Sequence, residues 1–324
     1  MTLRVVIGVL GPTGVGKTAV GVALGAMLCT RVVSCDSLQL YRGLPVLTNQ
    51  PSVDERGGVE HEMVGIADPL EEWSAARYAT AVRPLIERDL EACGAALLVG
   101  GTGLYLRAAL APLAAPAPAP RALQQRLEVR AATEGPLALH AELARLDPTA
   151  AAAIDPRNVR RLIRALAVLQ MAAAQGDGAV ARWSGRDDLW SPSYYHPTML
   201  VGLTLPREDL YARINLRTRH MLREGAIEEV ATILARYGQA GEGEGALARG
   251  IGKAIGFRLL AEHLRGKLAL EDVEDRLAAA TRAYARRQLT WMRKMPGVVI
   301  MDVSGREPGD VAAEIAAGVG HCGG

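Results

Sequence analysis

Short apolar runs alternate with longer amphipathic segments along most of the chain. Residues Leu3–Leu10 form an apolar, β-branched run that is typical of a buried parallel strand. The segment from Lys17 onward has the apolar spacing of a helix. Similar patterns predict strands at 31–36, 95–101, 198–205 and 298–303, helices from 207 and over 270–294, and a loop at 241–245. This alternation predicts an α/β protein with a parallel sheet.

The middle of the chain has a different pattern. Residues 112–120 are a Pro/Ala segment that can continue neither a helix nor a central strand. From there to about residue 175 the pattern is almost wholly helical, with Pro136, Pro148 and Pro156 at the expected helix starts. Because strands lie on both sides of this block, we predict an α/β core of residues 1–112 and 194–324. Residues 113–193 are predicted to be an α-helical insertion domain.

Composition excludes several classes of protein. The 324 residues are 49% apolar and 22% charged, as in ordinary globular proteins. With a net charge of only +2, any nucleic-acid surface must be local. The four cysteines form no C-x-x-C pair and have no zinc spacing. No apolar stretch reaches the length of a membrane span, and a strand is expected almost at Met1, so we expect a cytoplasmic protein.

One glycine-rich segment carries a strong chemical signal. Residues 11–18 read GPTGVGKT and match the P-loop pattern G-x-x-x-x-G-K-[ST] between a predicted strand and a predicted helix. There backbone N–H groups converge on phosphate oxygens, Lys17 adds a charge and the Thr18 hydroxyl can hold Mg²⁺. A coincidental match is the alternative, and the flanking elements argue against it. We therefore predict a P-loop NTPase-like sheet whose polyphosphate ligands are Gly11, Pro12, Thr13, Gly14, Val15, Gly16, Lys17 and Thr18.

Two more segments follow predicted strands, where ligands bind in open α/β sheets. Asp36 ends the strand at 31–36 and could be a general base, a metal ligand or a helix cap. Gln39 could contact a base edge or simply lie on the surface. The segment VGGTGLY at 99–105 allows close backbone approach, and Thr102 could bind a phosphate or ribose. An ordinary glycine-rich turn is the alternative there.

Arginines gather on two predicted helices. Arg157, Arg161 and Arg164 fall at i, i+4 and i+7, with Arg160 beside them. A second stripe, on the helix at 270–294, consists of Arg282, Arg286 and Arg293, flanked by Arg287 and Lys294. Basic faces without acidic partners suit nucleic-acid phosphates, although a solvated surface is the usual explanation for one such helix. Arg213 and Arg217, at i and i+4, could both reach one anion.

In this order, these motifs resemble the tRNA dimethylallyltransferase (isopentenyltransferase) family of bacterial type. The resemblance covers nearly the whole chain, and the DS-x-Q-x-Y and RQ-x-TW elements are more specific than the P-loop. The matching parts are GPTGVGKT, S-x-DS-x-Q-x-Y at 34–41, His61 with Asp68-Pro69, LVGGTGLYL at 98–106, NVRRLIRAL, YARINLR and RQLTWMRK at 287–294.

The resemblance implies a specific reaction. A dimethylallyl group would pass from dimethylallyl diphosphate to the exocyclic N6 of adenine 37, beside the anticodon, in tRNAs that read codons starting with U. Asp36 would be the general base, Thr13 and Arg217 would act near the reacting oxygen, and Thr102 would position the nucleotide. Lys17, Thr18, Arg213 and Arg217 would hold the diphosphate with Mg²⁺. The chemistry is coherent, because a departing diphosphate needs positive charge and N–H donors.

The resemblance also implies a tRNA-binding surface. The anticodon stem-loop would contact Asp36, Ser37, Leu38, Gln39, Thr102, Arg160, Arg161, Leu162, Ile163, Arg164, Lys253, Arg258, Arg286, Arg287, Gln288, Trp291 and Arg293. The chain departs from the family pattern at Gln50, at Gln124, and at Lys253 and Phe257 of a segment that usually reads QAIGY. No membrane partner is expected, and we expect a monomer.

Three other functions share parts of these patterns. A P-loop kinase of a small metabolite would use residues 11–18 for ATP and Asp36 as base, but it leaves the two arginine stripes unexplained. A regulatory NTPase would need a strand ending in Asp, and the strand ending at Gly101 does not supply one. A prenyltransferase acting on free AMP shares the core but does not need a long basic insertion.

Overall fold

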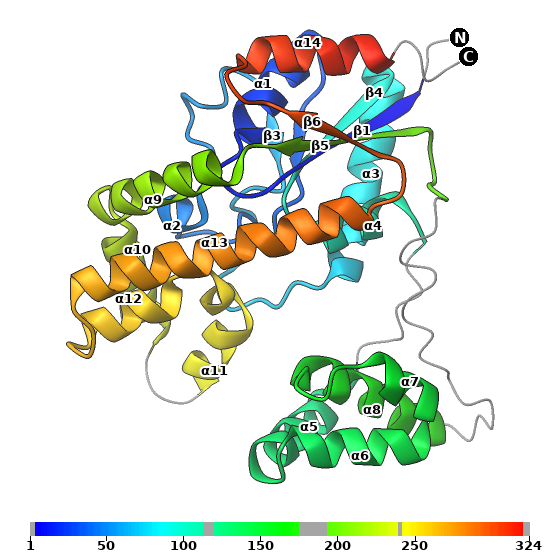
Figure 1. Cartoon of the computed structure of the whole chain (residues 1–324), viewed down its shortest axis with the longest axis vertical. Helices are drawn as coiled ribbons and strands as arrows, with labels where there is room; N and C mark the ends of the chain where they lie inside the picture. Colours follow the sequence, from blue (N-terminus) through cyan, green and yellow to red (C-terminus); the bar gives the residue numbers. More distant parts are fainter. Residues whose placement is uncertain (1–3, 113–118, 175–192, 239–241, 320–324) are drawn as a thin grey trace. The chain divides into compact units, whose positions relative to one another are not determined.

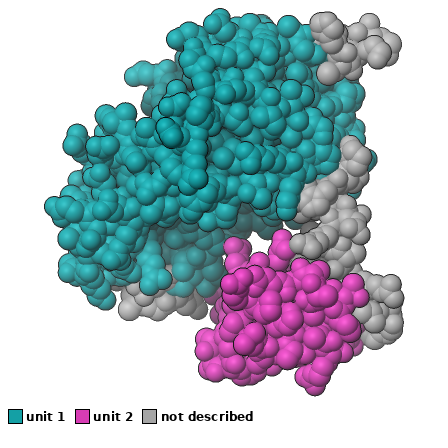
Figure 2. Space-filling model, viewed as in Figure 1, with its two compact units in different colours: residues 1–112, 192–324 teal, residues 113–191 magenta. Residues whose placement is uncertain are grey.

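The computed structural model describes residues 4–112, 119–174, 193–238 and 242–319 (Figure 1). The chain divides into two compact units, residues 1–112 with 192–324, and residues 113–191 (Figure 2). The first unit is a core around a parallel sheet, and the second is a helical insertion. The boundaries observed at 112 and 192 lie within two residues of those expected from the sequence.

A six-stranded sheet, parallel throughout, organises the core. Its order is β3-β2-β4-β1-β5-β6, so β1 lies between β4 and β5. β1 and β4 are buried along their whole lengths, which explains their continuous apolar sequences. The strands are β1 Val5–Leu10, β2 Val32–Ser34, β3 His61–Glu62, β4 Ala95–Gly100, β5 Thr198–Thr204 and β6 Val298–Asp302. The predicted parallel α/β fold is confirmed.

Helices cover both faces of this sheet (Figure 1). The helices of the core unit are α1 Lys17–Met27, α2 Pro45–Thr48, α3 Ala75–Cys93, α4 Gly103–Leu110, α9 Arg207–Arg223, α10 Ala226–Tyr237, α11 Glu242–Arg249, α12 Phe257–Leu264, α13 Leu270–Lys294 and α14 Pro308–Val319, with a 3₁₀ turn, η2, at Ile251–Lys253. α1 and α14 lie together on one face, and α3, α4 and α13 lie on the other (Figure 1).

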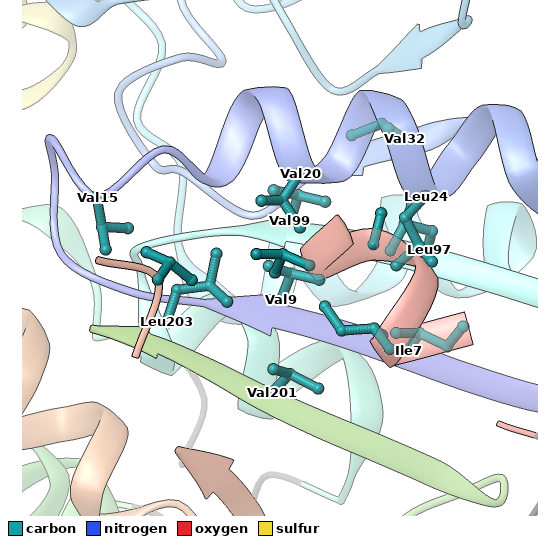
Figure 3. Close-up of a cluster of buried hydrophobic side chains, with 14 of the residues drawn as sticks. Ile7, Val9, Val15, Val20, Leu24, Val32, Leu97, Val99, Val201 and Leu203 are labelled. Atoms are coloured by element: carbon teal, nitrogen blue, oxygen red, sulfur yellow. The ribbon is translucent and has the colours of Figure 1, made fainter. Parts of the chain in front are cut away.

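One hydrophobic core of this unit lies between α1 and the sheet (Figure 3). Val20 and Leu24 of α1 pack over Val9 and Leu97, and all four side chains are buried. Close packing requires Gly21 there, because a Cβ at this position would lie 2.9 Å from the Val99 side chain on β4. This contact fixes α1, and therefore the loop before it, against the carboxyl end of the sheet.

The insertion has its own core. It contains α5 Arg121–Thr133, α6 Pro136–Leu146, α7 Pro148–Ala153 and α8 Val159–Ala174. Leu127, Leu139, Leu143 and Leu162 are completely buried among these helices. Pro136 and Pro148 open α6 and α7 as predicted, since proline fits the first helical turn. The prediction for Pro156 was wrong, because α8 begins only at Val159.

The chain leaves and re-enters the core at neighbouring points. The backbone N–H of Tyr195 donates to the carbonyl oxygen of Leu110 at 2.9 Å. The aromatic ring of Tyr195 lies 4.6 Å from the guanidinium carbon of Arg83, and Arg83 Nη2 donates to the Ala108 carbonyl oxygen at 2.9 Å. The core segments that flank the insertion in the sequence therefore lie side by side.

Other predictions made from the sequence need correction. The glycine-rich stretch at 241–245 is not a loop from Glu242 onward, because α11 starts there. Arg157 precedes α8, so it does not share that helix with Arg161 and Arg164. The prediction missed α3, which contains Pro84 in its interior. Within the described residues, no helix combines the length and the apolar character that crossing a bilayer requires.

Candidate active site

Three loops meet at the carboxyl ends of neighbouring strands. β1 leads into residues 11–16, β2 into 35–39 and β4 into 101–102. Backbone hydrogen bonds join two of these loops: Cys35 N–H donates to the Val99 carbonyl oxygen at 2.8 Å, and Thr102 N–H to the Cys35 carbonyl oxygen at 3.1 Å. The parallel order of the strands therefore brings together three segments that are distant in the sequence.

The P-loop has the backbone geometry that its glycines allow. Gly14 has a φ of 87° and Gly16, the residue before α1, has a φ of 102°, a region that side chains with a Cβ rarely adopt. Lys17 Nζ bends back over the loop and donates to the carbonyl oxygens of Gly11 at 3.0 Å and Pro12 at 2.9 Å. The loop and its lysine thus form a cation-lined cradle at the start of α1.

Burial and two neighbouring charged groups act on the pKa of Lys17. Burial lowers the pKa of its ammonium to about 8, the nearby Asp36 carboxylate opposes this, and Arg217 adds to the lowering. Burial also lowers the pKa of Arg217, again opposed by Asp36. Two cations held close together away from water favour an anion between them. This is the electrostatic environment that a diphosphate requires.

Thr13 connects the P-loop to two helices of the second half of the chain. Its hydroxyl oxygen accepts from Arg217 Nη1 of α9 at 2.9 Å, and its N–H donates to Gln288 Oε1 of α13 at 2.8 Å. Gln288 Nε2 in turn donates to the Gly101 carbonyl oxygen at 3.2 Å. A Cβ at Gly101 would overlap that nitrogen, so the glycine leaves the room that this hydrogen bond needs. Gln288 thus ties the P-loop to the loop after β4.

The loop after β2 is fixed by its own polar side chains. Asp36 Oδ1 accepts from the Leu38 N–H at 3.0 Å, so Asp36 caps a turn as well as facing the site. The Ser37 N–H donates to Thr102 Oγ1 at 3.1 Å. Gln39 Oε1 accepts from Ser34 Oγ at 2.8 Å, and its amide nitrogen donates to the Asn49 carbonyl oxygen. Both ends of the Gln39 amide are therefore engaged within the protein.

A cavity opens beside these groups and has two kinds of wall. Thr13, Asp36 and Arg217 form a polar end. The remaining lining is mostly apolar: Leu38, Leu47, Ile214, Met221, Ile255 and Leu277, with Thr48, Thr218, Thr281 and Tyr284. An anionic head at the polar end and a short hydrocarbon tail along the apolar wall match this division of the lining.

Sequence reasoning missed Tyr284, which lies one helical turn before Gln288 on α13. Its hydroxyl interacts with the side chains of Thr102 and Gln288, and burial raises its pKa well above the usual value. Tyr284 and Gln288 therefore form one polar patch in the second half of α13, where Arg286, Arg287 and Arg293 are exposed. The i, i+4 spacing of two hydrogen-bonding side chains was the available signal.

The predicted RNA-binding residues of the core fall into distinct settings. Arg213 is exposed one turn before Arg217, and Arg286, Arg287 and Arg293 are exposed on α13. Trp291 is half-buried and packs on Gly103. Lys253 pairs with Glu72 at 3.2 Å and Arg258 with Glu262 at 2.9 Å, so each has an acidic partner. Gln288 is only 5% exposed, which corrects its expected place on a surface.

The predicted RNA-binding residues of the insertion lie on α8. Arg160 and Arg161 are exposed, and Ile163 and Arg164 are half-buried. Leu162 is completely buried in the core of this unit, so a direct contact of its side chain with RNA is excluded. Arg157, in the turn before α8, pairs with Asp155 at 2.9 Å. The basic stripe of the insertion is therefore shorter than the sequence predicted.

Comparison with known protein families supports this interpretation of the site. The model of the IPP transferase family matches residues 39–295, which include Gln39, the insertion and the whole of α13. The chain belongs to the IPP transferase family. The resemblance found in the sequence motifs is thereby confirmed, and with it the assignment of the chain to a family of transferase enzymes.

Individual relatives cover nearly the whole chain. A tRNA dimethylallyltransferase of Thermomicrobium roseum is 40% identical over 94% of this chain and 87% of its own length. One of Anaeromyxobacter dehalogenans is 41% identical over 90% of this chain and 92% of its own length. The crystal structure of a tRNA isopentenylpyrophosphate transferase of Bacillus halodurans matches with a TM-score of 0.68 and 32% identity, covering 98% of both chains.

A eukaryotic dimethylallyltransferase crystallised while acting on tRNA is also similar. It has a TM-score of 0.75 and 25% identity, and the match covers 97% of this chain and 77% of the other. The structures that resemble this chain therefore include both bacterial and eukaryotic members, and they confirm the P-loop NTPase-like fold.

Proposed function

We propose that this protein transfers a dimethylallyl group from dimethylallyl diphosphate to the exocyclic N6 of adenine 37 in tRNAs that read codons starting with U. The observation that carries the proposal is a cavity whose lining combines Thr13, Arg217 and Asp36 with six apolar side chains. A prenyl diphosphate has the same division into an anionic head and a short hydrocarbon tail. The tRNA dimethylallyltransferases among its relatives support the acceptor.

The P-loop binds the leaving group in this proposal. Backbone N–H groups of residues 14 and 16–18, the Lys17 ammonium and the Arg217 guanidinium surround the diphosphate, and the exposed Arg213 extends this positive region. As the bond between the allylic carbon and oxygen breaks, negative charge develops on that oxygen. Arg217 and the Thr13 hydroxyl are hydrogen-bonded to each other and stabilise this charge.

The P-loop also suits Mg²⁺. Among the described residues, no group of three or more His, Cys, Asp and Glu side chains could hold a metal ion by itself. Mg²⁺ commonly takes one or two protein ligands together with phosphate oxygens and water, and the Thr18 hydroxyl on the first turn of α1 fits that role. When bound, Mg²⁺ would neutralise charge on the diphosphate.

Asp36 is the proposed general base. The N6 nitrogen attacks the allylic carbon, the carbon–oxygen bond to the diphosphate breaks, and the Asp36 carboxylate takes the proton lost from N6. The Leu38 N–H holds one oxygen of Asp36 in place, and Thr102, fixed by Ser37, would orient the nucleotide. Because an adenine stacked in an anticodon loop cannot enter such a cavity, it must leave the stack first.

The acceptor would be held by the exposed arginines. On the core these are Arg286, Arg287 and Arg293 of α13, and on the insertion Arg160 and Arg161 of α8. Lys253 and Arg258 already have acidic partners, so their contribution to RNA binding should be smaller. The anticodon stem-loop is the proposed partner, and the protein is proposed to act as a monomer.

A transfer assay tests the proposal. The protein is incubated with labelled dimethylallyl diphosphate and either tRNA or AMP, and separately with ATP. We expect label in tRNA only. ATP turnover without label transfer would instead indicate a kinase, and label in AMP alone would indicate a free-nucleotide prenyltransferase.

A pair of variants tests the role of Asp36. Asp36→Ala should lower transfer by about 10²–10⁴-fold and leave tRNA affinity within about threefold, because loss of a general base affects the chemical step. Asp54→Ala, at an exposed position, is the matched control and should behave like the unmodified chain. Loss of tRNA binding with an unchanged single-turnover rate would refute the role as base.

A further inference from the structure

Two exposed cysteines meet at the edge of the sheet opposite the candidate active site. Cys29 directly precedes the turn into β2, and Cys93 is the last residue of α3, just before β4. The Cys93 Sγ lies 3.0 Å from the Cys29 carbonyl oxygen, although the two residues are 64 positions apart. Nothing in the proposed reaction uses either thiol.

A second hydrogen bond joins the chain segments that follow these two cysteines. Thr30, directly after Cys29, donates its hydroxyl to the carbonyl oxygen of Ala95, two residues after Cys93, at 3.0 Å. Cys29 itself has a φ of 51°, which turns the chain sharply at the end of α1. Pairing of the sulfurs would require the Cys93 side chain to rotate away from the Cys29 carbonyl oxygen and toward the Cys29 sulfur.

A third cysteine, Cys35, differs from these two in its exposure to oxidants. Cys35 is buried, its sulfur lies 2.9 Å from the Tyr78 hydroxyl, and burial raises its pKa to about 12. Because the thiolate is the reactive form, Cys35 is protected from oxidants at neutral pH. Exposure and proximity single out Cys29 and Cys93.

We propose that Cys29 and Cys93 form a redox modification site that a low-molecular-weight disulfide closes into an intrachain disulfide. The thiolate of one cysteine attacks the oxidant and releases one thiol, and the other thiolate attacks the resulting mixed disulfide and releases the second thiol. The two cysteines lose two protons and two electrons, and oxidised glutathione is reduced to two molecules of glutathione.

The location predicts the effect of this bond. It would join the end of α1 to the end of α3, at the amino ends of β2 and β4, whereas the P-loop and Asp36 lie at the carboxyl ends of the strands. Closing a long loop restricts the unfolded chain, so the disulfide should stabilise the core. The proposed site therefore modifies the stability of the fold and leaves the cradle for the diphosphate unchanged.

The test uses the full chain carrying Cys322→Ser, which leaves three cysteines. Treatment with oxidised glutathione should lower the thiols titrated after denaturation from three to one, and mass spectrometry of the digest should show a linked pair of peptides containing Cys29 and Cys93. The melting temperature should rise by roughly 3–10 °C relative to the reduced protein.

Single replacements provide the controls. With Cys93→Ser or Cys29→Ser in the same background, oxidised glutathione should yield one stable glutathione adduct and no rise in melting temperature. In the chain with both cysteines, persistent adducts on each without a linked peptide pair would overturn the proposal. A disulfide between two chains, or one that involves Cys35, would also overturn it.

Discussion

Gln288 Oε1 accepts a hydrogen bond from the backbone N–H of Thr13 at 2.8 Å, across 275 positions of the sequence. The other end of the same amide donates to the Gly101 carbonyl oxygen. One side chain on α13 thereby fixes both the loop that would hold the leaving group and the loop that would orient the acceptor. The distance between donor and acceptor substrates depends on this amide.

Replacing that amide should therefore reduce catalysis more than binding. Gln288→Ala removes both hydrogen bonds, and we expect kcat to fall about 10- to 100-fold and the free energy of unfolding to drop by about 1–3 kcal/mol. Steady-state kinetics and urea unfolding measure the two effects. Thr290→Ala, at an exposed position of the same helix, is the control. A change in the KM for tRNA alone would show that Gln288 contacts RNA and does not position Thr13.

The pKa of Lys17 predicts proton uptake on binding of pyrophosphate. Below pH 8 the ammonium is charged with or without a ligand. Above pH 8 the free protein loses this proton, and a bound anion restores it, so binding at pH 9 should take up a proton at Lys17 that binding at pH 7 does not.

Calorimetry in buffers of different ionisation enthalpy measures this uptake. Lys17→Arg keeps a charge that does not titrate, so the difference between it and the unmodified chain isolates Lys17 from the protons of pyrophosphate itself. Equal uptake by the two proteins at pH 9 would contradict the lowered pKa.

The apolar wall of the cavity should contribute to binding of the prenyl tail and not to binding of the diphosphate head. Ile255→Ala shortens a half-buried side chain of this wall, and we expect affinity for dimethylallyl diphosphate to fall about 5- to 30-fold, or about 1–2 kcal/mol. Affinity for inorganic pyrophosphate should not change. Leu270→Ala, at a 40% exposed position outside the cavity, is the control, and titration with both ligands makes the comparison.

Exposed arginines to which the described residues offer no acidic partner should dominate RNA binding. Replacing Arg160 and Arg161 by alanine should weaken tRNA binding and lower the slope of log K against log salt by about one unit for each phosphate that the variant no longer neutralises. Arg258→Ala should change that slope less, because Glu262 already neutralises this arginine. Equal slopes for the double variant and the unmodified chain would make α8 a structural surface.

Much of the fold was predictable because its signals are local. The helix predicted over 270–294 is observed as α13 with the same bounds, and the apolar runs around β1 and β4 are strands within two residues of the prediction. The P-loop glycines also act locally, since their positive φ values are a property of a few residues. Where the sequence alone determines backbone geometry, the prediction succeeded.

The details that failed depend on side-chain contacts that the hydrophobic pattern of the sequence does not show. Gln39 was expected at a base edge or on the surface, but Ser34 and Asn49 bind both ends of its amide. Leu162 and Gln288 belong to arginine-rich segments that suggested a surface, and each is buried by other elements. Tyr284 was not noticed because its i, i+4 spacing from Gln288 indicates a site only once Thr102, from a distant part of the sequence, is known to lie beside it.

The hydrogen bond between Tyr195 and Leu110 joins the core segment before the insertion to the core segment after it. Because these two core segments lie side by side, the insertion between them can be exchanged for that of another family member without changes to the sheet. Under the proposed function, in which the core carries the reaction and the insertion contacts the anticodon stem, the chemistry and the choice of RNA can diverge separately.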